Sequence, residues 1–210
     1  MARTVRDAAL LLSAMTGRDD RDPASADAPE TIPDYTANLA ADGLAGRRIG
    51  VIRNYAGAGS HPDVERVLEA SIRALESAGA EIIDDIELDT EGADEHEYTV
   101  LLYEFKHDLA AYLEESGAPY KNLDELIAFN EANADVVMPF FGQEIFLAAE
   151  EKGPLSDAAY LDALAESKRI AREGIDGAIE EHRLDAIIAI TNGPAWMIDH
   201  ANGDSFHIGS

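Results

Sequence analysis

A strand, a helix and a second strand follow one another within residues 48–88, and this succession constrains the fold more than any other feature of the chain. Residues 48–53 (RIGVIR) have the pattern of a strand, and Pro62 stands at the first position of a helix whose apolar side chains recur on one face. Gly79 ends that helix, and residues 81–88 hold the apolar positions of a second strand. The pattern predicts a βαβ unit with a right-handed crossover and a parallel pair of strands.

A third strand is predicted at residues 184–190, which are almost wholly apolar. Such a run is typical of a strand buried on both faces of a sheet. It leads directly into residues 191–210, which are rich in Gly, Asn and Pro. Because open α/β sheets bind ligands at the carboxyl ends of their strands, we expect a pocket loop there.

Helices are predicted before, between and after the first two strands. Thr4 caps a first helix at residues 4–16, with Asp7 in its first turn. The segment 94–181 is rich in helix, with its clearest periodicity at residues 98–113. Shorter helices are expected at 123–132 and 140–151, and Ser156 is expected to cap a long one.

Residues 18–46 form a strip without periodicity, which contains three prolines and seven acidic residues. A stretch of this length without secondary structure is unusual inside a compact domain. We expect it to run over a surface that lies elsewhere. The fold class predicted from all segments is α/β with a helix-rich middle.

The charge of the chain excludes several classes of function. Forty-two acidic side chains against sixteen basic ones give a formal charge of −26, which disfavours nucleic acid and anionic membranes as partners. Such a surface resembles that of proteins from salt-loving organisms, and an ordinary acidic protein is the alternative. The chain has no cysteine, so disulfides and thiolate chemistry are excluded. No apolar run approaches the roughly 18 residues of a membrane span, and we expect a cytoplasmic protein.

No metal site or cofactor is predicted. His200, Asp204 and His207 are the nearest metal-ligand candidates, but their spacing matches no common pair of ligands on a helix. The run Asp19-Asp20-Arg21-Asp22 is followed by proline and alanine where a calcium loop needs a ligand and a glycine, so a solvated turn is expected. The pairs His96-Glu97 and His107-Asp108 are expected to be solvated or to cap helices.

The residues alone predict no catalytic site. The chain contains neither a Gly-x-Ser-x-Gly elbow nor a Ser-x-x-Lys motif, and no glycine-rich phosphate loop. Trp196, the only tryptophan, stands in a polar loop. It either lines a pocket or anchors the loop on the core.

Several stretches together resemble the amidase signature family, the serine hydrolases that cleave carboxamides with a Ser-(cis-Ser)-Lys triad. These stretches are residues 3–12 (RTVRDAALLL) with Gly17, Asp19, Asp22 and Ser25, then 46–51, 103–109, 141–144, 153–155, 184–186, 193–196 and 202–204. They occur in the order of the family and span nearly the whole chain. The resemblance implies that residues 1–210 are one partial amidase-signature domain with a mixed sheet and no cofactor.

In that family the nucleophilic serine, the bridging serine and the lysine lie upstream of the helix that begins here at residue 3. The resemblance therefore implies that no residue of this sequence is catalytic, and that Met1 is an interior methionine of the family. We also expect the chain to stop before the closing helix and strands. The strands would then keep open edges and uncovered apolar faces, which predicts a missing amino-terminal half as partner, or self-association.

The resemblance also suggests which residues line a substrate pocket. They are Phe141, Gln143, Thr191, Gly193, Pro194, Trp196 and Asp199. For Phe141 and Gln143 the alternatives are helix packing and a solvated amide, and for residues 191–199 the alternative is turn chemistry that ends a strand. The substrate would be a small-molecule amide bound by the complete enzyme.

Three functions stay open at this point. The chain is a portion of an amidase that is inactive alone, or a subunit of a split amidase that completes a separately encoded catalytic half. The third alternative is a non-catalytic binding module derived from the fold.

Overall fold

The structure is a computed structural model that describes residues 2–54 and 61–203. Three residues considered above, Met1, Asp204 and His207, lie outside this part of the chain. In chain order the elements are α1 (Val5–Met15), the 3-10 helix η1 (Pro23–Asp27), β1 (Arg48–Ile52), α2 (Pro62–Ser77), β2 (Glu81–Ile86), α3 (Ala93–Glu115), α4 (Leu123–Ala132), α5 (Ala134–Val137), α6 (Glu144–Glu150), α7 (Ala158–His182) and β3 (Ala186–Ile188).

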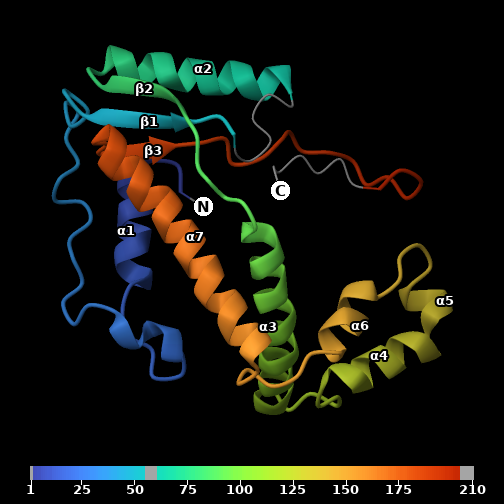
Figure 1. The fold of residues 1–210 in the computed structure, drawn as a ribbon. Helices are drawn as coiled ribbons and strands as arrows, with labels where there is room; N and C mark the ends of the chain where they lie inside the picture. Colours follow the sequence, from blue (N-terminus) through green and yellow to red (C-terminus); the bar gives the residue numbers. More distant parts are fainter. Residues whose placement is uncertain (1, 55–60, 204–210) are drawn as a thin grey trace.

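The three strands form one parallel sheet in the order β2-β1-β3 (Figure 1). The βαβ unit predicted from residues 48–88 is confirmed, and so is the α/β class. Within the described residues every strand pair is parallel, so the mixed sheet expected of the family is not represented among them.

A helix covers each face of the sheet. Side chains of α2 pack on one face around Val51, in a cluster that also holds Leu68, Ile72 and Ile190. The end of α7 packs on the other face around Ile52, with Ile86, Ala178 and Leu184. Alternate residues of β1 thus point into two different clusters, which makes β1 the buried central strand.

The expectation that residues 184–190 are buried on both faces is wrong for most of the segment. Only Ala186–Ile188 form the strand β3, and the side chain of Ala186 is exposed while those of the two isoleucines are half-buried. The apolar composition anticipates cover on both sides of the strand. In the described residues β3 lies at the edge of the sheet, so β1 is its only neighbouring strand there.

Helices α3 and α7 lie side by side and extend away from the sheet (Figure 1). The rings of Tyr103 and Tyr160 meet between them with centroids 5.5 Å apart. A third apolar cluster joins α3 to α4 and α6 through Leu102, Leu123 and Ala149. The helix-rich middle segment therefore has a core of its own, separate from the two clusters at the sheet.

Two helix starts differ from the sequence prediction. The long helix begins after Asp157 rather than Ser156. The helix expected at 140–151 begins only at Glu144, because the chain leaves α5 at Met138 and passes through Pro139 and Gly142 in extended or irregular conformations. The first helix begins where the capping pattern predicts, with the Thr4 hydroxyl accepting a hydrogen bond from the Asp7 N–H at 3.0 Å.

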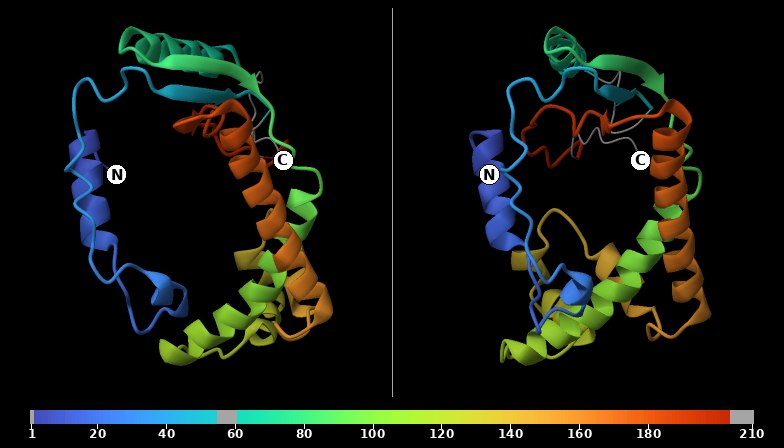
Figure 2. Two further views of the ribbon diagram at one scale, coloured as in Figure 1. Left: turned by 60° about the vertical axis from the view of Figure 1, so that its left-hand side comes forward. Right: turned by 90° about the vertical axis from the view of Figure 1, so that its left-hand side faces the viewer.

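Helix α1 and the strip 18–46 stand apart from the α3–α7 pair, across an opening seen in both views of Figure 2. No residue of α1 is buried, and Val5 and Met15 are 72% and 73% exposed. The strip returns to the sheet at Gly46, whose N–H donates to the carbonyl of Gly79 at 2.8 Å.

The open arrangement has a measurable consequence. The chain exposes 14819 Å² of surface. A compact monomer of 22.6 kDa exposes about 9500 Å². The excess of about 5000 Å² confirms the expectation that this part of an α/β domain leaves apolar faces uncovered.

Candidate functional site

The segment beyond β3 begins at the carboxyl end of the strand and continues without regular structure through residues 191–203. Its backbone is held by its own side chains. The Asn192 carboxamide oxygen accepts from the Gly193 N–H at 2.7 Å. The Asp199 carboxylate accepts from the N–H groups of Ala201 and Asn202 at 2.9 and 3.0 Å. These contacts are typical of Asx turns.

Asp199 is also bonded to the side-chain amide of Asn202 at 2.7 Å. This hydrogen bond, followed by those from the two backbone N–H groups, lowers the pKa of Asp199 below its ordinary value. The carboxylate is therefore ionised and committed to its own turn. Its direct role here is to shape the backbone of the segment.

The first half of the segment borders an apolar groove. The groove has a volume of about 820 Å³ and lies between α2 and the end of β3. Thr191 and Pro194 line it together with Asn192, opposite α2 side chains that include Val67 and Leu75. Asp63 is the one ionisable side chain in this lining.

The second half of the segment borders a different cavity, of about 520 Å³, beneath the α5–α6 connection. Here the imidazole of His200 stacks on the ring of Phe140, with centroids 4.0 Å apart and an angle of 12° between the planes. The ring of Phe141 approaches the same imidazole at 5.9 Å. Residues about 60 positions apart in sequence thus form one aromatic wall.

Gln143 lies in this cavity, where its side chain is tied to α4. Its carboxamide oxygen accepts from Asn130 Nδ2 at 3.0 Å, and its Nε2 donates to the carbonyl of Ile127 at 3.3 Å. Both ends of the amide are therefore engaged within the protein. Gln143 acts on the cavity by fixing the start of α6 against α4.

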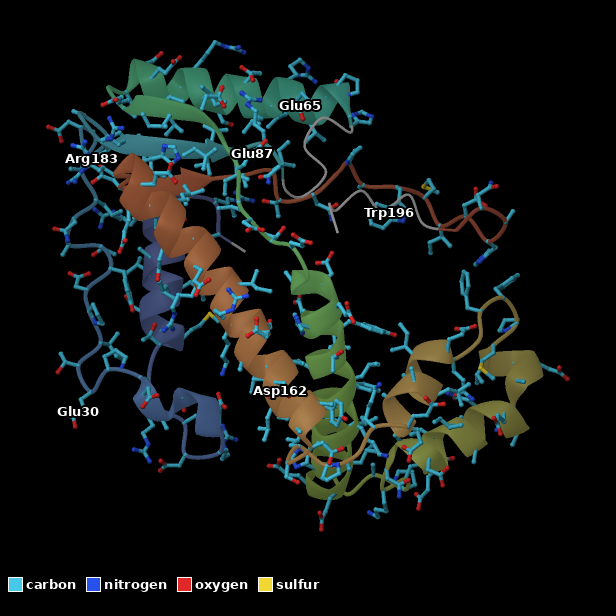
Figure 3. All side chains as sticks on the ribbon, viewed as in Figure 1. Glu30, Glu65, Glu87, Asp162, Arg183 and Trp196 are labelled. Carbon is cyan, nitrogen blue, oxygen red and sulfur yellow. The ribbon has the colours of Figure 1, made fainter. Side chains whose placement is uncertain are left out.

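The structure thus divides the seven predicted pocket residues between two places. Thr191 and Pro194 lie at the groove, with Gly193 between them in the chain, whereas Phe141 and Gln143 lie in the aromatic cavity. Trp196 is half-buried in the stretch that joins the two (Figure 3).

Sequence reasoning did not select Phe140 or Asn130 for this site. The signal that could have found Phe140 is the pair of adjacent phenylalanines between two short helices, because both rings cannot point into one core from such a turn. Their side chains are 62% and 60% exposed. Exposed aromatic rings around a cavity are typical of a ligand-binding surface.

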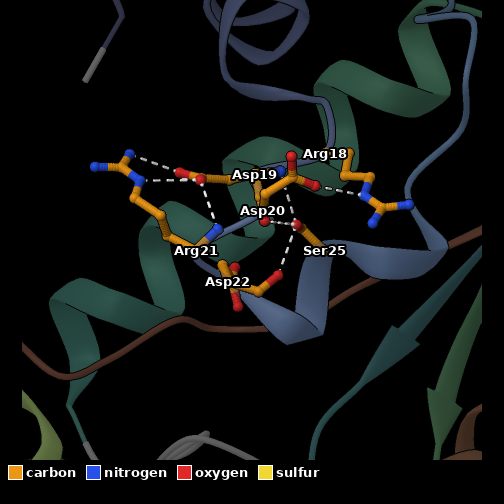
Figure 4. Close-up of polar contacts among 6 residues, drawn as sticks. All are labelled: Arg18, Asp19, Asp20, Arg21, Asp22 and Ser25. Atoms are coloured by element: carbon orange, nitrogen blue, oxygen red, sulfur yellow. Dashed lines mark hydrogen bonds and ion pairs between the residues drawn. The ribbon is translucent and has the colours of Figure 1, made fainter.

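The acidic run at residues 19–22 forms a turn stabilised by ion pairs (Figure 4). The Asp19 carboxylate accepts from Arg21 Nη2 at 2.7 Å, and the side-chain hydrogen bond from Arg21 lowers the pKa of Asp19. Asp20 pairs with Arg18 at 3.0 Å. The Ser25 hydroxyl donates within the same turn, whose backbone carbonyls at Asp19 and Asp22 lie 2.9 and 2.8 Å away. The solvated turn predicted here is confirmed.

The histidines offer no metal centre within the described part of the chain, where no group of three or more ligand side chains converges. His200 stacks on a phenylalanine, and His107 Nδ1 lies 2.8 Å from its exposed neighbour Asp108. Among residues 2–54 and 61–203, no helix is long and apolar enough to cross a membrane.

The arrangement can bind but contains few groups that could react. The cavity wall offers aromatic rings and aliphatic side chains, and its ionisable members are Glu144 and His200. Such a surface accommodates the apolar part of a small molecule.

Comparison with known proteins gives a consistent result. Residues 1–206 match the protein-family model described as Amidase. The chain is 36% identical over 199 residues to a probable amidase of Arabidopsis thaliana, a match that covers 90% of this chain and 37% of the plant protein. It is 31% identical over 211 residues to a glutamyl-tRNA(Gln) amidotransferase polypeptide of Pseudomonas fluorescens, covering 97% of this chain and 42% of the relative.

Solved structures extend the similarity to the fold. A peptide amidase in complex with the competitive inhibitor chymostatin shares 41% identity and superposes with a TM-score of 0.89, over 99% of this chain and 42% of the other. The native peptide amidase from Stenotrophomonas maltophilia shares 42% identity with a TM-score of 0.82, over 93% and 40% of the two chains. The 210 residues thus span about two fifths of the length of these relatives.

Proposed function

Because the chain belongs to the amidase family, we propose that it supplies the carboxyl-side portion of an amide hydrolase. The reaction is hydrolysis of a linear carboxamide to a carboxylate and ammonia or an amine. The reacting serine and lysine belong to the part of the domain outside these residues, and the chain is inactive alone. The observation that carries the proposal is the family match over residues 1–206, together with the fold similarity to a peptide amidase over 99% of the chain.

The part played by this portion is to shape the substrate pocket. The segment 191–203 forms one wall, with Thr191, Gly193, Pro194 and Trp196 facing the substrate. Phe141 supplies an apolar surface at the far end, 5.9 Å from the imidazole of His200. Gln143 and Asp199 serve the pocket indirectly, since each holds backbone in place through its hydrogen bonds.

A second candidate is a subunit of a split amidase, which completes a separately encoded catalytic half. The large uncovered surface of the chain favours this form, because about 5000 Å² of excess area requires cover by another body. The chemistry is the same in both cases. They differ in whether the two portions are joined by a peptide bond.

We place the protein in the cytoplasm of a salt-loving organism. The formal charge of −26 supports this proposal, because crowded carboxylates repel one another less when ions screen them.

A chimera tests the proposed function directly. The region of the Stenotrophomonas maltophilia peptide amidase that matches this chain is replaced by residues 1–206, so that the relative contributes everything outside the match. Ammonia release is then measured from acetamide, propionamide, benzamide and a peptide amide. We expect turnover by the chimera and none by the 210-residue chain alone. Serine-dependent turnover by the chain alone would contradict the proposal, as would a cooperatively folded chimera without activity.

A further inference from the structure

The groove between α2 and β3 has the geometry of an unfinished α/β layer. On its α2 side lie Val67, Ser71 and Ala74, which are all exposed, and on its other side the chain passes from Ile188 to Asn192. Val67 is 59% exposed although it belongs to the apolar stripe of its helix. In a complete layer, a second helix would lie beside α2 and cover these side chains.

The backbone of β3 offers an open edge to the same groove. The Asp185 N–H donates to the carbonyl of Arg48 at 2.8 Å, so this side of the strand faces β1. Backbone groups alternate along a strand, and the N–H groups of Ala186 and Ile188 therefore point away from β1. Among the described residues no strand pairs with that side. An edge of this kind accepts a further strand.

The lining of the groove is unlike the rest of the surface. Charged residues make up 28% of the chain, which carries a net charge of −26. Of the residues that line the groove, Asp63 alone is charged. A large uncharged surface on a strongly acidic protein indicates a face that is covered by another polypeptide.

The area identifies the kind of occupant. A standard interface buries about 800 Å² on each partner, so a second copy docked at this edge would leave most of the excess of about 5000 Å² exposed. A small ligand would cover still less. The peptide amidase to which the chain is similar is more than twice as long, since the match covers 42% of it. Only a body of that size accounts for the exposed area.

We propose that this groove is the docking surface for the part of an amidase domain that these 210 residues do not contain, which adds a strand to the outer edge of β3 and an amphipathic helix beside α2. The inference rests on the proposed function, because it takes the partner from the amidase family. It adds the location of the contact and the two elements that the partner must provide.

The test uses two separate polypeptides. One is the 210-residue chain, and the other is the Stenotrophomonas maltophilia peptide amidase with its matched region replaced by a Gly/Ser linker. Association is measured by light scattering after size-exclusion chromatography, and hydrogen exchange is followed at the amides of Ala186 and Ile188. We expect a one-to-one complex in which exchange at these two amides slows at least tenfold.

A matched pair of variants locates the contact. Ser71 and Ser77 are both exposed serines of α2 whose hydroxyls donate to the carbonyl four residues earlier, but only Ser71 lines the groove. We expect Ser71→Arg to weaken the complex at least tenfold and Ser77→Arg to leave it unchanged. Ala186→Pro, which removes an outward N–H without touching the β1 pairing, should weaken it independently.

The outcomes separate this inference from the proposed function. No complex at micromolar concentration, a complex indifferent to both Ser71→Arg and Ala186→Pro, or a stable dimer of the chain through this groove overturns the docking surface, even if the covalent chimera hydrolyses amides. A complex that responds to these variants supports the docking surface even where the chimera is inactive, and in that case the proposed function alone fails.

Discussion

Asp185 and Arg48 join the two strands that lie furthest apart in the sequence. The Asp185 carboxylate accepts from the Arg48 backbone N–H at 2.8 Å, and the Asp185 N–H donates to the carbonyl of Arg48 at the same distance. The carboxylate also pairs with the guanidinium of Arg47 at 2.9 Å. One residue before β3 thus fixes the register of β3 against β1.

Replacement of this carboxylate should loosen the edge of the sheet. Asp185→Asn keeps one acceptor but removes the charge, so we expect a lower urea midpoint at pH 7 and faster hydrogen exchange in β3. Asp162→Asn on the exposed side of α7 is the control and should leave the midpoint unchanged. Equal effects of the two variants would mean that net charge, not this contact, determines the result.

The same contact predicts a pH dependence. The hydrogen bond from the Arg48 N–H, followed by that from Arg47, holds the pKa of Asp185 below its ordinary value. Its stabilising effect is therefore present above the unfolded-state pKa of about 3.9 and is lost as the pH falls through the lower folded-state value. The difference in urea midpoint between the wild type and Asp185→Asn should be constant from pH 7 to 5 and shrink below about pH 4. A difference that grows on acidification would contradict this assignment.

Gly50 and Gly177 should respond to alanine in opposite directions. A Cβ at Gly50 would lie 2.5 Å from Leu184 Cδ1 and 2.7 Å from Ile86 Cδ1, so Gly50→Ala should destabilise the protein by about 1–3 kcal/mol. A Cβ at Gly177, inside α7, meets nothing within 4 Å, and Gly177→Ala should stabilise by about 0.5–1 kcal/mol. Urea unfolding curves measure both. A neutral Gly50→Ala would show that the two strands and α7 pack less closely than described.

Lys106 should stabilise the helical segment through its hydrogen bonds. Its ammonium group donates to the carbonyls of Glu150 and Lys152 at 2.6 and 2.8 Å, at the end of α6. Lys106→Met keeps most of the apolar stem and leaves these carbonyls without their donor, so we expect a loss of about 1–3 kcal/mol. Lys168→Met, at an exposed position of α7, is the matched control and should have little effect. Similar losses in both variants would contradict the assigned role.

Salt should raise the stability of the protein. Forty-two acidic side chains repel one another, and molar KCl screens charges beyond about 3 Å. We expect the melting temperature to rise steadily between 0.1 and 3 M KCl. A flat or falling melting temperature would remove the support for a salt-loving source.

Phe141 should affect substrate binding more than turnover. In the peptide amidase chimera, we expect Phe141→Ala to raise KM for benzamide about tenfold, with a smaller effect on acetamide and little change in kcat. Phe129→Ala is the control, because that ring contacts Tyr120 outside the cavity. A fall in kcat for every amide would place Phe141 in the folding of the domain rather than at the substrate.

Local features were predicted from the sequence because neighbouring residues determine them. The helix start at Thr4 depends on a hydroxyl and an N–H three residues apart, and the βαβ unit depends on the change of apolar period between residues 48 and 88. The starts of α6 and α7 were missed, because Gln143 and Asp157 interact with Asn130 and Tyr103, which are distant in the sequence. The family was predicted from short stretches in a fixed order and is confirmed by the match over residues 1–206.

The sequence by itself determined which segments become strands and helices, since hydrogen bonding within helices and the apolar period act over a few residues. Only the tertiary structure decided that β3 lies at the edge of the described sheet, that Asp185 binds Arg48, and that His200 stacks on Phe140. These relationships join residues 60 to 137 positions apart, as in the pair formed by Arg48 and Asp185. Each depends on which surfaces meet when the chain folds, and no local pattern encodes that choice.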